Sequence, residues 1–336
     1  MIDPSIPLVE LHRHLDGNIR LQTILELGFQ HNIQLPSSDV NGLRPFVQVT
    51  DPRPGVMAFI SKFHWPLAVL KDADACFRVA YENVEDAKRE GLDYVELRFS
   101  PWFMAEPNRL DPFMVVESVV EGIAAGIRHF GVGVNLIGIL SRTYGPEIAA
   151  KELYALLGQR DHIIALDLAG DEANYPAEWF KNHFKCARDA GWHVTVHAGE
   201  IAGPESIWHA IRDLGAERLG HAIRAPEDPG LISYLSDHQI GVESCLTSNL
   251  QTSCVPDYPS HPLKRFLDVG ILATINTDDP GISAIDLPYE YNVAAPKAGL
   301  SGDQIHQAQI NALDVSFLGE DEKKSMRIKS RNRPGN

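Results

Sequence analysis

Two histidines near the start of the chain have a spacing that could support metal chemistry. His12 and His14 follow the apolar-rich run Pro7–Glu10 and lie within Leu11–Gly17, so they mark the end of a predicted β-strand. Side chains at positions i and i+2 of a strand lie on the same face, so both imidazoles would face one metal. Two exposed histidines beside Arg13 would give the same pattern, so the pair alone does not distinguish a metal site from two surface histidines.

Other polar residues stand where further predicted strands end. They are Gly170, Asp171 and Glu172 after the fourth strand, His197 and Glu200 after the fifth, His221 at the sixth, Ser244 and Asn249 around the seventh, and Asp278 and Asp279 after the eighth. In an α/β barrel, the active site forms at the carboxyl ends of the strands. One site could therefore collect all of these side chains.

The residue types in this set suit a hydrolytic metal site. Three imidazoles and one carboxylate are a ligand set that suits zinc and leaves a position for water. On an extended backbone, Asp278 and Asp279 would point in opposite directions, one toward the metal and one toward a ligand. The alternative is that the two aspartates only begin the turn before Pro280.

The elements that must position these residues alternate between strands and helices. The predicted strands are Pro7–His14, Tyr94–Phe99, Gly133–Leu140, Ile163–Ala169, Val194–His197, Arg218–His221, Gly241–Cys245 and Leu272–Thr277. The predicted helices include Phe113–Phe130, Ala177–Ala190, Glu205–Leu214, Gly230–Asp237 and Pro262–Val269. This count predicts a TIM-type (β/α)₈ barrel that forms one domain over residues 1–336.

A long helical region, about residues 21–90, separates the first two predicted strands and is too long for a simple crossover. We therefore predict a helical insertion over the mouth of the barrel. Within Val56–Phe63, the spacing of Phe59 and Phe63 places both rings on one helix face. These rings could line a lid that excludes water, or they could belong to an ordinary amphipathic helix packed on the barrel.

Composition argues against several classes of function. Hydrophobic residues make up 44% and charged residues 22% of the 336 residues, as in an ordinary globular protein. The net charge of −15 disfavours nucleic acid and anionic membranes as partners. The four cysteines form no Cys-x-x-Cys pair, which disfavours a thiolate zinc site. We see no targeting segment and no uncharged stretch of about 20 residues, so we expect a cytoplasmic protein.

Four separated motifs resemble those of a known family. They are HRHLDG at His12–Gly17, HAGE at His197–Glu200, SCLTSN at Ser244–Asn249 and NTDDP at Asn276–Pro280. In this order they resemble the signatures of adenosine deaminases of the bacterial type, in the metal-dependent amidohydrolase superfamily. Arg13 departs from animal relatives, in which a small apolar residue is more familiar, and we expect it to affect packing more than chemistry.

The resemblance implies a role for each candidate residue. One zinc ion per chain would be held by His12, His14, His197 and Asp278. Glu200 would be the proton donor, and His221 would orient the attacking water. The substrate would be bound by His14, Asp16, Gly170 and Asp279, with Phe59 and Phe63 in the lid.

The deamination of adenosine requires these residue types on chemical grounds, apart from the resemblance. Replacing the 6-amino group of adenosine requires water to add at an aromatic carbon, and zinc can lower the pKa of water to about 7. The addition pushes electrons onto N1, so an acid must protonate that atom. Glu200 is placed for this role if the site keeps it protonated. Asp279 could bind N7, and the backbone N–H of Gly170 can approach N3 because no side chain intervenes.

Three functions remain open at this point. The favoured one is zinc-dependent deamination of adenosine and 2′-deoxyadenosine in purine salvage, with a small purine nucleoside as the partner. The second is a sister deaminase for adenine, a nucleotide or an N6-modified purine, where a nucleotide enzyme would need a basic phosphate pocket near Asp16. The third is a catalytically silent ligand-binding barrel, which should lack a metal ligand or the acid. Cytidine-type deaminases are excluded because the Pro-Cys-x-x-Cys signature is absent.

Overall fold

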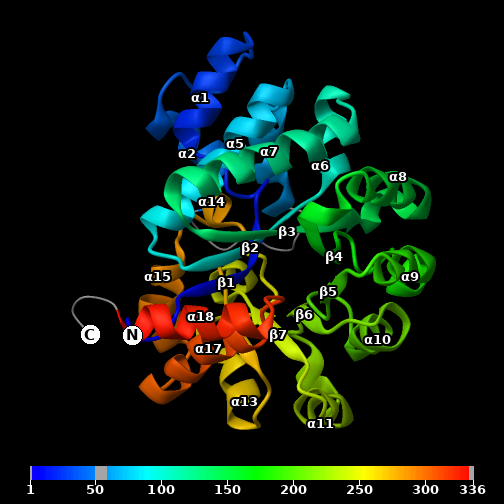
Figure 1. Cartoon of the computed structure of the whole chain (residues 1–336), viewed down its shortest axis with the longest axis vertical. Coiled ribbons are helices and arrows are strands. Elements are labelled where there is room, and N and C mark those ends of the chain that lie inside the picture. The colour runs from blue at the N-terminus through cyan, green and yellow to red at the C-terminus, as the bar shows by residue number, and fades with distance from the viewer. Residues whose placement is uncertain (1, 50–58, 333–336) are drawn as a thin grey trace.

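The computed structural model describes residues 2–49 and 59–332. Eight strands pair in parallel in their chain order, so the predicted barrel is confirmed (Figure 1). Each strand lies within two residues of its predicted bounds. The strands are β1 (Val9–His14), β2 (Tyr94–Phe99), β3 (Gly133–Ser141), β4 (Ile163–Ala169), β5 (His193–Ala198), β6 (Arg218–His221), β7 (Gly241–Ser244) and β8 (Ala273–Ile275).

The seam between β8 and β1 is closed by contacts beyond the end of β8. The backbone N–H of His14 donates to the carbonyl oxygen of Asp278 at 2.8 Å, and the N–H of Asp278 donates to the carbonyl oxygen of His12 at 2.9 Å. Arg13 and Asp278 form an isolated parallel bridge at the same place. Barrel closure therefore places Asp278 directly beside the two histidines of β1.

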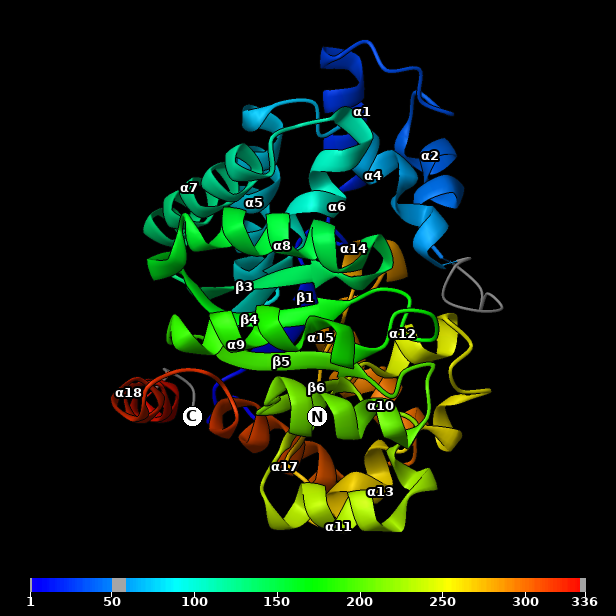
Figure 2. The same cartoon turned by 90° about the vertical axis from the view of Figure 1, so that its right-hand side faces the viewer.

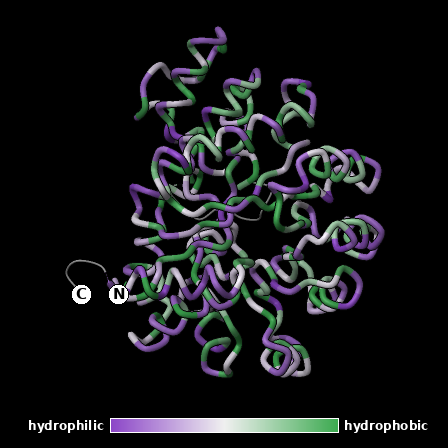
Figure 3. The backbone as a smooth tube through the Cα atoms, viewed as in Figure 1, coloured by the Kyte–Doolittle hydropathy of each residue, from purple (hydrophilic) through white to green (hydrophobic). Residues whose placement is uncertain are grey.

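Helices surround the barrel (Figures 1 and 2). The helices that follow β2 to β8 include α6 (Pro101–Ala105), α7 (Pro112–Phe130), α8 (Gly145–Leu157), α9 (Lys181–Asp189), α10 (Pro204–His209), α11 (Pro229–Asp237), α12 (Leu246–Gln251), α13 (Leu263–Asp268), α14 (Pro280–Ser283), α15 (Leu287–Tyr289), α17 (Gly302–Asp314) and α18 (Glu320–Arg331). The tube in Figure 3 shows hydrophobic and hydrophilic stretches on these outer helices, which is the pattern of elements packed on a core at one face.

The region between β1 and β2 contains the predicted helical insertion. Its described helices are α1 (Leu21–Gln30), α2 (Val40–Val47), η1 (Ser61–Phe63), α4 (His64–Ala68) and α5 (Ala73–Arg89). Helix α5 packs along α7, so the last part of this region is the crossover helix of the barrel. The added helices α1 and α2 lie at one end of the molecule (Figures 1 and 2). Val56–Ala58 of the predicted lid segment lie outside the described residues.

Charged residues fill part of the barrel interior instead of the usual branched apolar side chains. Arg98 of β2 donates from Nη1 to Asp167 of β4 at 2.9 Å and from Nη2 to Glu243 of β7 at 2.7 Å. Arg218 of β6 pairs with the same Glu243 at 2.7 Å and with Glu96 of β2 at 2.5 Å. These five side chains are fully buried, and each charge has a partner of opposite sign, as buried charges require.

Arg13 also lies in a buried ion pair. Its guanidinium donates to both carboxylate oxygens of Glu90, at 2.7 and 3.0 Å. This pair ties the end of β1 to the C-terminus of α5, as expected for a residue that contributes to packing. Among residues 2–49 and 59–332, no helix is long and apolar enough to cross a membrane.

Candidate metal centre and active site

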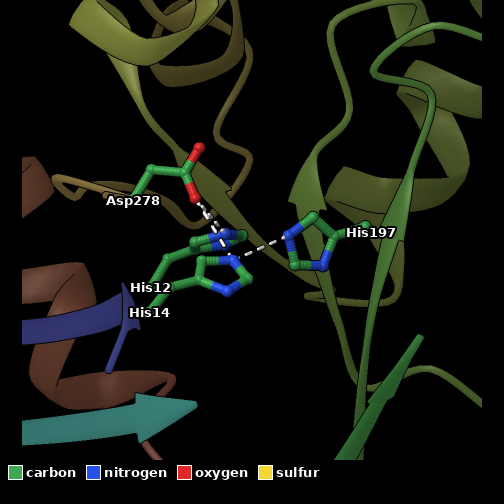
Figure 4. Close-up of side chains that lie close together, drawn as sticks. All are labelled: His12, His14, His197 and Asp278. Carbon is green, nitrogen blue, oxygen red and sulfur yellow. Dashed lines mark hydrogen bonds and ion pairs between the residues drawn. The ribbon is translucent and has the colours of Figure 1, made fainter. Parts of the chain in front are cut away.

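Three histidines and one aspartate converge at the carboxyl ends of β1, β5 and β8 (Figure 4). Nε2 of His14 lies 3.2 Å from Nε2 of His197 and 3.3 Å from Oδ1 of Asp278. Nε2 of His12 lies 3.2 Å from the same Oδ1. One ligand atom from each residue lies within 4.8 Å of all the others. The sequence therefore identified a set of residues that the fold brings together.

The chemistry of this set fits a metal ion. Nε2 of His12 is buried and has no hydrogen-bond partner among the described residues, although it faces Asp278. Burial lowers the pKa of His197 to about 3, so its imidazole ring is uncharged at neutral pH. Burial opposes ionisation of Asp278, but the charges of the neighbouring histidines outweigh it and hold the pKa of this carboxyl well below its usual range. A neutral imidazole and an ionised carboxylate are the forms that bind metal. Because neighbouring carboxyl groups raise the pKa of His14 despite burial, this ring would release a proton when it binds the ion.

Buried carboxylates orient two of the three imidazoles from behind. Nδ1 of His12 lies 2.8 Å from Oε2 of Glu243, and Nδ1 of His197 lies 2.9 Å from Oδ2 of Asp167. A carboxylate on the far nitrogen fixes both the orientation and the tautomer of a metal-binding histidine. Because Arg98 binds both carboxylates, the ionic network inside the barrel supports the cluster directly.

The two adjacent aspartates diverge, but not for the reason that the sequence suggested. The prediction assumed an extended backbone, whereas β8 ends at Ile275 and Asp278 has a left-handed backbone with φ +68°. This turn aims Asp278 at the histidines, where Ser248 Oγ also donates to Oδ2 at 2.7 Å. The assumption of strand alternation was therefore wrong, although the two side chains do separate.

Asp279 has an oxygen without a partner. Its Oδ1 is buried and accepts no hydrogen bond within the described part of the chain. Burial and the charge of Asp278 raise the pKa of Asp279 well above its usual range. Gly17 allows the close approach, because a Cβ atom there would stand 1.7 Å from Oδ1. Asp279 therefore offers an unused polar group to a ligand.

Glu200, in the loop after β5, and His221, the last residue of β6, face the same space. Nε2 of His221 lies 3.8 Å from Oε2 of Glu200 and 3.9 Å from Oδ2 of Asp278. Nδ2 of Asn249 donates to Nδ1 of His221 at 3.1 Å, which fixes the ring. Burial raises the pKa of Glu200, as a proton donor needs.

The cluster opens into a cavity of about 330 Å³. Asp16, Gly170, Phe59 and Phe63 all line it, as the sequence predicted. The ring centroids of the two phenylalanines lie 6.3 Å apart, so they form an apolar wall opposite the polar groups. Gly170 has φ +110°, and a Cβ atom there would stand 2.5 Å from Oγ1 of Thr143. Only glycine therefore fits at position 170 without strain.

Asp16 lies between the cavity and the cluster. Its Oδ2 accepts a hydrogen bond from the backbone N–H of Ser100 at 3.3 Å, and its Oδ1 lies 3.7 Å from Nδ1 of His14. Burial would lower the pKa of His14, but the nearby charge of Asp279 and the contacts with Asp16 and Asp278 raise it to about 9. Asp16 therefore faces both a ligand in the cavity and a member of the cluster.

Comparison with known proteins assigns the family. Residues 7–330 match the family described as adenosine deaminase. An adenosine deaminase of Vibrio cholerae is 59% identical over 98% of this chain and 99% of that protein. The chain belongs to the adenosine deaminase family. This family is metal-dependent, and the four clustered residues form its candidate metal site in this chain.

Solved deaminases share the fold of this adenosine deaminase family member. An adenine deaminase of Arthrobacter aurescens has a TM-score of 0.89 at 25% identity and is covered over 98% of its length, with 97% of this chain. An N6-mAMP deaminase of arabidopsis has a TM-score of 0.82 at 26% identity, with 98% of this chain and 99% of that chain covered. The barrel is therefore common to enzymes described as acting on different purines.

The residues that orient the cluster were not among those predicted from the sequence. They are Asp167, Glu243, Arg98, Ser248 and Arg142, all of which are buried. A signal was present, because a charged residue inside an otherwise apolar buried strand needs a partner. The partners come from different strands, so only the closed barrel reveals which charges meet.

Proposed function

We propose that this protein deaminates adenosine and 2′-deoxyadenosine hydrolytically, giving inosine and 2′-deoxyinosine with release of ammonia. One observation carries the proposal: three imidazoles and Asp278 converge at the wall of the same cavity that Glu200, His221 and Asp279 face. Membership of the adenosine deaminase family and 59% identity to the Vibrio cholerae protein support it.

One zinc ion per chain would be held by His12, His14, His197 and Asp278. When bound, it supplies a Lewis acid that makes water nucleophilic at neutral pH. Asp167 and Glu243 keep two of the imidazoles aimed at it. The donor set favours zinc because three imidazole nitrogens and one carboxylate oxygen suit a borderline ion.

Glu200 transfers a proton to the purine in this proposal. Burial raises its pKa, which favours the protonated carboxyl, and protonation of N1 at the moment of water addition avoids charge build-up on the ring. Nδ1 of His221 accepts from Asn249, so the neutral ring carries its hydrogen on Nε2 and would orient the water by donating from that atom.

The remaining cavity residues bind the nucleoside. Asp279 donates the proton of its neutral carboxyl to N7, and the N–H of Gly170 binds N3. Asp16 and His14 hold the 5′-hydroxyl of the ribose. Phe59 and Phe63 cover the purine and exclude water from the reacting carbon. The helices between β1 and β2 act as a lid of the same domain.

The charge of the cavity favours a nucleoside over a nucleotide. Asp16 lines it, and a 5′-phosphate beside Asp16 would meet a second negative charge. The alternative is a sister deaminase for adenine or an N6-modified purine, because enzymes described with those substrates share the fold. A cytoplasmic location remains a prediction.

Loss of the adenine absorbance band tests the proposal. Adenosine, 2′-deoxyadenosine, adenine, AMP and N6-methyladenosine are assayed in parallel with the zinc-loaded protein. We expect adenosine and deoxyadenosine to give the highest kcat/KM, with ammonia released in equal amount. A higher kcat/KM for adenine, AMP or N6-methyladenosine would replace the proposal by the corresponding sister activity, and no turnover of any would favour a binding protein.

The variant Glu200→Gln tests the proton donor. It keeps the shape of the side chain but removes the transferable proton, so kcat for adenosine should fall by roughly 10²–10⁴-fold. Zinc content and binding of purine riboside should stay near normal. A near-normal kcat would show that another group protonates the ring.

A further inference from the structure

Glu172, in the loop after β4, accepts an unusual number of hydrogen bonds from one segment. The backbone N–H groups of four consecutive residues, Gly199–Ala202, donate to its carboxylate at 2.5, 3.1, 3.0 and 3.1 Å. Ser206 Oγ donates to the same group at 2.5 Å. The side chain of Glu172 is buried. Four backbone donors of the loop after β5 and one side-chain donor of α10 therefore meet a single carboxylate.

This loop needs such a partner because its backbone turns away from the sheet. It leaves β5 after Ala198 and reaches α10 at Pro204, with Gly199 in a left-handed conformation at φ +69°. Consecutive N–H groups that turn toward one point form a concave site for an anion. An unmade hydrogen bond at a buried N–H costs about 1–3 kcal/mol. Glu172 supplies the anion from inside the protein.

Arg142 holds the start of the same loop. Its Nη2 donates to the carbonyl oxygen of His197 at 2.7 Å and to that of Leu168 at 3.0 Å. Arg142 is fully buried, and the charge of Glu172 acts on it more strongly than that of any other carboxylate. The segment that carries both His197 and Glu200 is therefore fixed at a carbonyl by Arg142 and at its N–H groups by Glu172.

Glu172 does not line the cavity, whereas Glu200 does. Because the backbone N–H of Glu200 is one of the four donors, the position of the Glu200 carboxyl depends on Glu172. We propose that Glu172 is a positioning residue that holds the Gly199–Ala202 backbone so that Glu200 faces the purine. This inference rests on the proposed role of Glu200. Displacing a reacting group by about 1 Å can cost about 10²-fold in rate.

The first test replaces Glu172 by glutamine. Glu172→Gln keeps the side-chain shape but removes the charge and turns an amide group toward the backbone donors. We expect kcat for adenosine to fall at least about tenfold, while KM changes less than about threefold and zinc content stays the same. Unchanged kcat, or a loss that appears only in KM or in zinc content, would overturn the inference.

Glu217→Gln is the matched control. Glu217 accepts the backbone N–H of Val194 at 3.1 Å, at the opposite end of the same strand β5. It is therefore also a carboxylate bound to a backbone donor, but it is far from the candidate site in the barrel. We expect kcat to remain near that of the unmodified protein. A similar loss in both variants would show a general effect on the strand and contradict the positioning role.

A double variant separates positioning from a structural role. If Glu172 acts through Glu200, adding Glu172→Gln to Glu200→Gln should lower kcat by less than about threefold more. Losses that multiply would overturn the inference. A near-normal kcat of Glu200→Gln alone would instead contradict the proposed function of Glu200. If Glu172→Gln does not fold, Glu172→Asp serves in the same cycle, because it keeps the charge and shifts its position.

Discussion

At the scale of single residues, Asp278 and Asp279 are adjacent yet differ in their surroundings. The Asp278 side chain faces the three histidines, whose charges hold its pKa well below the usual range despite burial, whereas burial and the charge of Asp278 raise the pKa of Asp279, which faces the cavity. Asp278→Ala should weaken zinc binding, because it removes a ligand and a negative charge, and added zinc should restore part of the activity. Asp279→Ala should keep the zinc but weaken inhibition by purine riboside, which resembles the transition state when hydrated. Zinc per chain after dialysis and the inhibition constant measure both effects.

A reversed outcome for this pair would be informative. If Asp279→Ala lost the metal and Asp278→Ala kept it, the two assignments would have to be exchanged. Ser248→Ala is a useful comparison, because it removes only the hydrogen bond at 2.7 Å to Asp278 and should lower zinc retention less than Asp278→Ala does.

Asp16 raises a different question, because it lies near both the cavity and His14. If it binds the ribose, Asp16→Ala should raise KM for adenosine at least about tenfold and change turnover of adenine little, since adenine has no ribose. Steady-state kinetics on both substrates distinguish the cases. Equal losses on both would show that Asp16 acts mainly on His14, from which it is separated by 3.7 Å.

The metal ligands and most polar cavity residues could be predicted as candidates because they stand at or just after strand ends. For His12, His197 and Asp279, the strand count and the rule that barrel loops form the site predicted a shared site, and the resemblance to the family implied their separate roles. The buried partner Glu243 could not be paired with His12, because β1 meets β7 across the barrel interior. Asp167 lies on β4, next to the strand of His197, but a strand count does not show which side chains of two neighbouring strands meet. The direction of the Asp278 side chain depends on the left-handed backbone conformation of Asp278 itself, which the local sequence does not predict.

At the scale of elements, Glu152 of α8 connects the ends of β2 and β3. It accepts hydrogen bonds from the backbone N–H of Ser141 and from Ser100 Oγ, both at 2.7 Å. Burial raises the pKa of Glu152 to about 7, from an ordinary value of 4.5. A raised pKa gives stability that is complete below pH 4.5 and is lost as the pH rises through 7. The packing of α8 on these strands should therefore weaken with rising pH.

This predicts a specific difference between the unmodified protein and Glu152→Gln. From pH 5 to pH 8, the free energy of unfolding of the unmodified protein should fall by roughly 2–3 kcal/mol relative to that of the variant. Urea unfolding of both proteins at several pH values measures it. Asp228→Asn is the control, because the hydrogen bond from Trp208 Nε1 lowers the pKa of Asp228, so its stability difference should stay flat between pH 5 and pH 8. A flat difference for Glu152→Gln would show that Glu152 is ionised in the folded protein.

The region between β1 and β2 shows where prediction from element patterns was incomplete. Its helical content was predicted, but not its division into the crossover helix α5 and the added helices before it. Asp72 begins α5 by accepting the N–H of Ala75 at 2.9 Å, which is a recognisable helix start. The packing of α5 along α7 is a tertiary contact, and helical periodicity does not specify the neighbour of a helix.

At the scale of the whole molecule, the metal site and the closure of the barrel occupy the same place. Two ligands come from β1, one follows β8, and one lies in β5. The seam between β8 and β1 has hydrogen bonds at His14 and Asp278, which are themselves ligand residues. Helix α17 covers the seam from outside by packing on both strands. A bound metal would therefore connect β1 to the segment that follows β8, and few backbone hydrogen bonds join these two directly.

Removing the metal should consequently loosen the seam more than the rest of the barrel. A ligand that binds only the folded state stabilises it, and local opening follows the weakest connections first. In the chelator-treated protein, the amide hydrogens of His14 and Asp278 should exchange at least about tenfold faster than in the zinc-loaded protein. Amides within β2 and β3, whose ladder contains no ligand, are the internal control and should change much less. Equal acceleration at both places would mean that the metal stabilises the barrel globally, and no acceleration at the seam would show that hydrogen bonding and α17 close it without the metal.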